Sequence, residues 1–87
     1  MKLVHELWKD ESDGEFTFCL AGPAGDGARA LLEGKAELVW SCEAESHFEA
    51  MTKYYAYQGW GQYTTEFEQD HWPYVNDLGK TRKPNVR

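Results

Sequence analysis

Apolar and polar residues alternate along two stretches near the N-terminus, residues 3–9 and 15–21. A period of two is typical of a β-strand with one buried face. An Asp-Gly dipeptide at 13–14 separates the stretches and favours a tight hairpin turn, because both turn positions tolerate positive φ. A turn centred there would place Leu7 opposite Leu20. One face of this hairpin, which we assign to the core, would carry Leu3, Leu7, Phe16, Phe18 and Leu20.

A glycine-rich segment follows, and after it comes a third alternating stretch. We expect Asp26 to cap a short helix over residues 28–33, which Gly34 would end. In that helix, Leu31 and Leu32 would face inward. Residues 36–42 alternate again and predict a third strand, with three inward side chains: Leu38, Trp40 and Cys42.

A longer helix is expected from His47 to about Gln58. Ser46 and Glu49 have the spacing of a capping box, in which each side chain accepts a backbone N–H of the other residue. Gly59 is well placed as the left-handed stop of the helix, and residues 60–68 predict a short extended segment. The order β-β-α-β-α predicts an α+β fold with two helices on one face of a three-stranded sheet, or a four-stranded one if the last segment joins it.

This helix carries aromatic residues on two opposite faces, whereas a chain of 87 residues has room for one modest core. One face holds Phe48, Met51, Thr52, Tyr55 and Gly59, and we expect it to be the core face. The other holds His47, Ala50, Tyr54 and Tyr57. Three interpretations of the second face stay open: plain exposed surface, cover by residues 72–74, or an interface with a partner or a second copy. The interface candidates are His47, Tyr54, Tyr57 and Trp60.

Charge is distributed unevenly along the chain. Residues 79–87 contain four of the nine basic residues and no acidic one, so the other 78 residues hold 5 basic and 15 acidic side chains, a net charge of 5 − 15 = −10. Such a body repels phosphate backbones, which weighs against nucleic-acid binding by the folded part. We expect one domain over residues 1–75 and a basic, disordered tail over 76–87.

No pattern of residues indicates a catalytic centre, a cofactor or a metal site. The loop at residues 20–28 lacks the Gly-Lys-Ser or Gly-Lys-Thr ending of a phosphate-binding loop. The acidic and histidine residues around Cys42 and His47 have none of the familiar metal-ligand spacings. We lean towards a non-enzyme. Cys19 and Cys42 are expected to be free thiols, which fits a cytoplasmic protein, although one disulfide between strands is an alternative. No apolar run approaches the ~20 residues of a membrane span.

The stretches FCLAGPAGDGARALL and Trp40 to Tyr63 resemble small uncharacterised bacterial proteins of unknown function. The resemblance implies a bacterial origin and carries over no activity and no site residue. Our leading hypothesis is a non-enzymatic, acidic protein–protein interaction module, with a homodimer through the aromatic helix face as one form of it. The alternative is a small-molecule-binding domain or small enzyme whose pocket is lined by Trp40, Tyr55, Trp60 and Tyr63, with Glu43 or His47 as its polar group. An inhibitor that mimics an acidic surface is a third reading.

Overall fold

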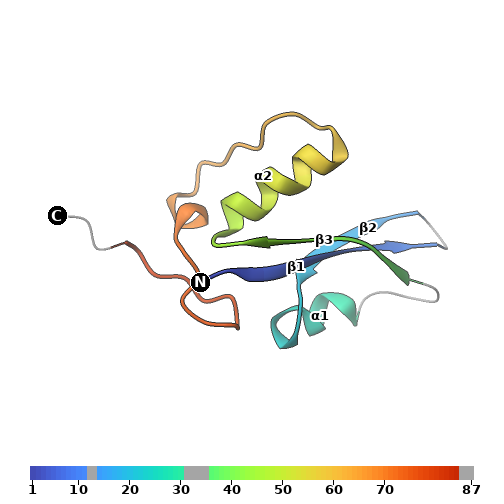
Figure 1. Ribbon diagram of the computed structural model, residues 1–87, viewed down its shortest axis with the longest axis horizontal. Coiled ribbons are helices and arrows are strands. Elements are labelled where there is room, and N and C mark those ends of the chain that lie inside the picture. The colour runs from blue at the N-terminus through green and yellow to red at the C-terminus, as the bar shows by residue number, and fades with distance from the viewer. Residues whose placement is uncertain (12–13, 31–35, 85–87) are drawn as a thin grey trace. The chain divides into compact units, whose positions relative to one another are not determined.

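The computed structural model describes residues 1–11, 14–30 and 36–84. Three strands form one antiparallel sheet in the order β2-β1-β3, and two α-helices and two short 3-10 helices complete the fold (Figure 1). The elements are β1 (Leu3–Asp10), β2 (Phe16–Leu20), η1 (Pro23–Gly25), α1 (Asp26–Arg29), β3 (Ala36–Ala44), α2 (His47–Gln58) and η2 (Glu68–His71). The predicted α+β class and element order are confirmed.

Backbone contacts divide the chain into two compact units. One consists of Val4–Cys42 and contains most of the sheet with α1; the other consists of Met1–Leu3 and the chain from Glu43 onward, and contains α2 and η2. The single domain over residues 1–75 therefore stays a prediction.

The hairpin of β1 and β2 has a different register from the one expected. Leu7 pairs with Phe18, not with Leu20. The connecting loop is longer than a two-residue turn: the Asp10 N–H donates to the Glu15 carbonyl at 2.9 Å, and the Gly14 N–H donates to the Asp10 carbonyl at 2.8 Å. Gly14 adopts a φ of 74°, which suits glycine. Because the shift is two residues, an even number, every side chain keeps its predicted face.

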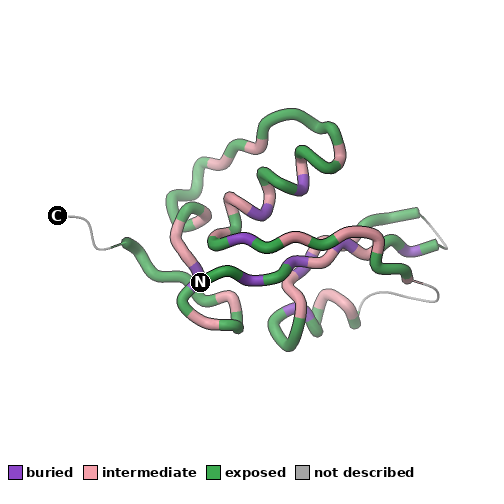
Figure 2. The backbone as a smooth tube through the Cα atoms, in the orientation of Figure 1, coloured by how far each residue is buried: buried purple, intermediate pink, exposed green. Residues whose placement is uncertain are grey.

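Burial on the predicted core face is concentrated towards the start of β1 (Figure 2). Leu7 is fully buried, and Leu3 and His5 are buried beside it. The ring of His5 stacks on Phe18 with centroids 5.6 Å apart. Phe16 is 43% exposed, so its assignment to the core was wrong. It pairs with Lys9 at the loop end of the hairpin, where the lysine ammonium lies 5.9 Å from the centroid of its ring.

Strand β3 lies beside β1 and is two residues longer than predicted. Trp40 is partly buried and stacks on Phe18 with centroids 6.1 Å apart. Leu38 is 46% exposed, which contradicts its expected inward position. Alternation indicates which side chains of β3 share a face, but burial also requires another element to pack on that face.

Helix α2 has the predicted bounds and a modified capping box. The Ser46 hydroxyl accepts the Glu49 N–H at 3.1 Å, as expected. The Glu49 carboxylate, however, accepts the N–H of Glu45 at 3.3 Å, rather than that of Ser46. Lys53 adds an ion pair to Glu49 at 3.5 Å and donates to the Glu43 carbonyl at 2.6 Å. The first turns of α2 are thus tied to the chain that precedes them.

The first helix begins earlier than predicted. Residues Asp26–Arg29 form α1 directly after η1, and Asp26 is the first helical residue rather than a cap, since no side chain caps this helix. Leu31, Leu32 and Gly34 lie outside the described residues.

The start of the basic segment forms a turn with the residues that precede it, and the disorder expected for residues 76–87 stays a prediction. Tyr74 and Thr81 form an isolated antiparallel bridge, and the Val75 N–H donates to the Lys80 carbonyl at 2.9 Å. Within this turn the Asn76 side chain accepts the N–H groups of Leu78 and Lys80. None of the helices in the described part of the chain is long and apolar enough to cross a membrane.

Candidate functional site

The C-terminal end of α2 positions an aromatic cluster. Gly59 adopts a left-handed φ of 73°, its N–H donates to Ala56 at 3.2 Å, and the next N–H, of Trp60, donates to Tyr55 at 3.0 Å. This pair of bonds is the Schellman motif, which reverses the chain and usually includes an apolar contact back to the last helical turns. Trp60 makes that contact twice, edge-on to Tyr54 and to Tyr55, each with centroids 5.3 Å apart.

Beyond Trp60 the chain runs back along α2. The ring of Tyr63 contacts Tyr55 at 5.2 Å and Phe48 at 5.6 Å, and Phe48 lies about two helical turns nearer the start of the helix. His71, at the end of η2, stacks on Phe48 with centroids 4.1 Å apart. Residues 60–71, which we call the return segment, therefore cover the Phe48 and Tyr55 side of the helix.

The return segment contains no strand, so residues 60–68 do not join the described sheet as a fourth strand. Its backbone is organised by side chains instead: the Asp70 carboxylate accepts the Thr65 hydroxyl at 2.8 Å and the Tyr63 hydroxyl at 3.4 Å. The Thr65 oxygen in turn accepts the Phe67 N–H at 3.1 Å. Local periodicity indicated an extended chain, but the aromatic contacts with α2 decide its path.

The two faces of α2 are buried in the opposite sense to the one expected. Ala50 is fully buried and Tyr54 is 7% exposed, and both belong to the second face, for which exposed surface, cover by residues 72–74 and an interface were all left open. Phe48 and Tyr55, on the predicted core face, are only partly buried and lie under the return segment. Residues 60–71 thus supply the cover of the first face.

The four interface candidates have different environments. Tyr54 is buried and receives a bond from Gln58 to its hydroxyl, so it is not a surface group in this chain. His47 is exposed, with its ring edge-on to Tyr63 at 6.4 Å. Tyr57 is 47% exposed and Trp60 is 57% exposed. The structure brings Trp60 together with Tyr54, and Trp60 and Tyr57 are the tyrosine and tryptophan rings of this group that are exposed.

Trp60 exposes far more surface than its structural role requires. The apolar contact that usually accompanies a Schellman motif can be made by an apolar side chain of any kind at this position. A tryptophan that is held by two ring contacts and a backbone bond, yet is more than half exposed, has the character of an interface anchor, because little rotamer freedom remains to be lost on binding.

The sequence around Trp60 lacks charge. Residues 54–65, YYAYQGWGQYTT, contain no Asp, Glu, Lys, Arg or His, although 28% of the chain is Asp, Glu, Lys or Arg, so that about three such residues are expected in twelve. We call these residues the neutral segment. Depletion of charge with enrichment in Tyr and Trp is the composition of interface cores. This sequence signal was available and was not used in the sequence analysis.

The rings proposed to line a small-molecule pocket contact one another. The ring of Tyr55 contacts those of Trp60 and Tyr63, with centroids 5.3 and 5.2 Å apart, which are edge-to-face contact distances. Trp40 belongs to the other unit, where it stacks on Phe18. Nothing in this arrangement favours the small-molecule alternative.

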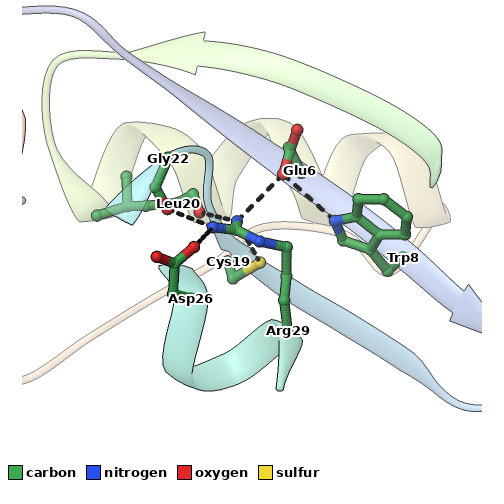
Figure 3. A network of polar contacts seen from close by, with 7 residues as sticks. All are labelled: Glu6, Trp8, Cys19, Leu20, Gly22, Asp26 and Arg29. Carbon is green, nitrogen blue, oxygen red and sulfur yellow. Dashed lines mark hydrogen bonds and ion pairs between the residues drawn. The ribbon is translucent and has the colours of Figure 1, made fainter. Parts of the chain in front are cut away.

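A second cluster, centred on Arg29, was missed by the sequence analysis (Figure 3). The Arg29 guanidinium donates through Nη1 to the Leu20 carbonyl at 2.8 Å and through Nη2 to the Gly22 carbonyl. It also pairs with Asp26 at 2.5 Å and with Glu6 at 3.3 Å. These bonds join α1 to the end of β2 and to β1. The pair with Asp26, above all, raises the pKa of Arg29 above its usual value.

Two features around Arg29 show how closely this cluster is packed. A Cβ on the buried Gly25 would lie 1.8 Å from the Leu20 oxygen that Arg29 binds. Burial raises the pKa of the Cys19 thiol, against the opposing effect of Arg29, whose Nη1 lies 3.9 Å from Sγ. Cys19 and Cys42 are both free thiols. The guanidinium is occupied by groups of its own chain, so we assign the cluster a structural role. In the sequence, Arg29 is the one Lys or Arg between Lys9 and Lys35, and this isolated charge is the feature that could have indicated the cluster.

Within the described residues, no group of three His, Cys, Asp or Glu side chains is arranged to hold a metal ion. Comparisons with protein-family models, with curated proteins and with solved structures gave no match for this chain.

Proposed function

We propose that this chain is a non-enzymatic, cytoplasmic protein–protein interaction module that binds through the exposed part of the neutral segment. The observation that carries the proposal is Trp60, fixed against α2 and 57% exposed. Tyr57, 47% exposed on the same helix, is the second anchor. Tyr and Trp provide large contact area for little loss of side-chain entropy, and Gly, Gln and Thr beside them offer adaptable hydrogen bonds.

The lack of charge in this segment distinguishes the proposal from a charge-mimicking inhibitor. Such an inhibitor would present carboxylates to a basic partner, and its binding would weaken steeply with salt. The neutral segment has no carboxylate to present. Binding through it should depend on aromatic contact area and change little with ionic strength.

The test compares Trp60→Ser with Phe67→Ser. Phe67 is 62% exposed and lies outside the neutral segment, so it matches the loss of an exposed aromatic ring at another place. Cross-linking of the wild-type chain in cells of its source, followed by quantitative mass spectrometry, should give protein adducts that Trp60→Ser loses and Phe67→Ser retains. Melting curves of both variants confirm folding. Equal adduct profiles for wild type and Trp60→Ser would refute the proposal.

A further inference from the structure

We propose that the partner of the neutral segment is a second copy of this chain, bound face to face across a twofold axis. The inference rests on the proposed function and names its partner. It is carried by the distribution of charge, by the exposure of Trp60 and by the kinds of polar group that surround it.

Charge restricts where two copies can meet. Outside its last nine residues the chain has a net charge of −10, so most contacts between identical surfaces would bring carboxylates together. In a twofold interface the same patch is used by both copies, and a residue on the axis meets itself. A charged residue there would meet its own charge at close range. Residues 54–65 contain no charged side chain and avoid this repulsion.

The side chains of the segment also suit pairing with themselves. The Gln62 amide both donates and accepts hydrogen bonds, so two copies of it are complementary, as are the hydroxyls of Thr64. Gln62 and Thr64 are exposed. Two indole rings attract in offset or edge-to-face arrangements, and Trp60 is already held in place for such a contact.

The size of the segment predicts a weak dimer. A standard interface takes roughly 20–30 residues from each side, and the neutral segment has only twelve, of which Tyr54 is buried. We therefore expect a dissociation constant of about 1–100 µM. Because the copies carry a net charge of −6 each, added salt should leave the dimer unchanged or strengthen it.

Sedimentation equilibrium on the full-length protein over about 5–500 µM tests the inference. We expect a reversible monomer–dimer equilibrium that Trp60→Ser weakens by about 30-fold or more, the size of effect typical of an interface hot spot, and that Phe67→Ser leaves unchanged. Trp60 fluorescence should shift to shorter wavelength as the dimer forms, because the indole leaves water. Because the chain has four tryptophans, the Trp60 emission is obtained by subtracting the spectrum of Trp60→Phe from that of wild type.

Charge variants at Gln62 identify the partner as a second copy. At low salt, Gln62→Glu alone and Gln62→Lys alone should dimerise less than wild type, and their equimolar mixture should recover a dimer of mixed composition by native mass spectrometry. A protein that stays monomeric at 500 µM overturns the inference, as does a dimer that Trp60→Ser does not weaken or that salt dissociates steeply. A monomer whose cross-linked adducts still require Trp60 would leave the proposed function standing and remove only the second copy as its partner.

Discussion

Gly25→Ala is the sharpest test of the Arg29 cluster. The backbone at Gly25 has φ −97° and ψ 0°, so an alanine would not have to adopt a left-handed conformation. The obstacle is steric: the new Cβ would lie 1.8 Å from the Leu20 oxygen, 2.6 Å from Nη1 of Arg29 and 2.9 Å from the Leu20 carbonyl carbon. Two of these three atoms belong to the backbone and cannot rotate away.

The magnitude follows from the displacement that would be required. Restoring a contact of about 3.2 Å requires the Leu20 oxygen or α1 to move by about 1.4 Å, which separates atoms now bonded at 2.8 Å. Overpacking typically costs about 1–3 kcal/mol, and a rigid backbone obstacle places this site at the upper end. For a domain of this size each kcal/mol lowers Tm by about 4–8 °C, so we expect a fall of about 10–20 °C.

Gly27→Ala is the matched control, two residues further along. Nothing lies within 4 Å of its Cβ position, its φ is not left-handed, and it lies inside α1. Alanine there should stabilise the chain by about 0.5–1 kcal/mol by favouring the helix and restricting the unfolded state. Calorimetry on wild type and both variants measures the two shifts. A Gly25→Ala variant that melts within 2 °C of wild type would show that the described packing of this loop is wrong.

Three further predictions test the helix and the thiol. Gly59→Ala should lower the free energy of unfolding by about 1–2 kcal/mol, since φ 73° is strained for a residue with a Cβ. A melting temperature equal to that of wild type would contradict the left-handed stop of α2. Tyr54→Ala should lower the free energy of unfolding by about 3 kcal/mol, whereas Tyr57→Ala should change it by no more than about 0.5 kcal/mol, as measured by urea unfolding. Similar losses for the two variants would mean that the burial of the two tyrosines is misassigned. In the Cys42→Ser background, the rate of Cys19 alkylation should rise with pH around a midpoint above the usual thiol pKa, because burial raises the pKa of Cys19. Arg29→Met should move this midpoint to still higher pH, because Arg29 lowers that pKa. Because the folded pKa is the higher one, the stability linked to Cys19 is present at neutral pH and is lost only as the pH rises above the ordinary thiol pKa, through the raised value.

Features that depend on neighbouring residues were predicted closely. The bounds of α2, the cap by Ser46 and the stop at Gly59 agree with the structure, because each arises from hydrogen bonds within a few residues of sequence. The faces of the β1–β2 hairpin were also predicted, although its register was not. Alternation determines which side a residue faces, while the register depends on the loop, whose length an Asp-Gly pair alone does not determine.

Features that depend on distant residues were decided by the tertiary structure. The pattern of α2 shows two apolar faces and contains no information on which is buried, since that depends on what lies against each. The structure buries Ala50 and Tyr54 and covers Phe48 and Tyr55 with the return segment. Arg29 reaches Leu20 and Glu6, nine and 23 residues away in sequence, and no local pattern encodes such a contact.

The same division holds for the proposed interface. The sequence alone determines that residues 54–65 are aromatic and uncharged, because composition needs no coordinates. Only the tertiary structure separates Tyr54, which is buried, from Trp60 and Tyr57, which reach solvent. The physical reason is that burial is a property of the whole set of packed neighbours, whereas turn, cap and strand preferences reside in a few adjacent residues.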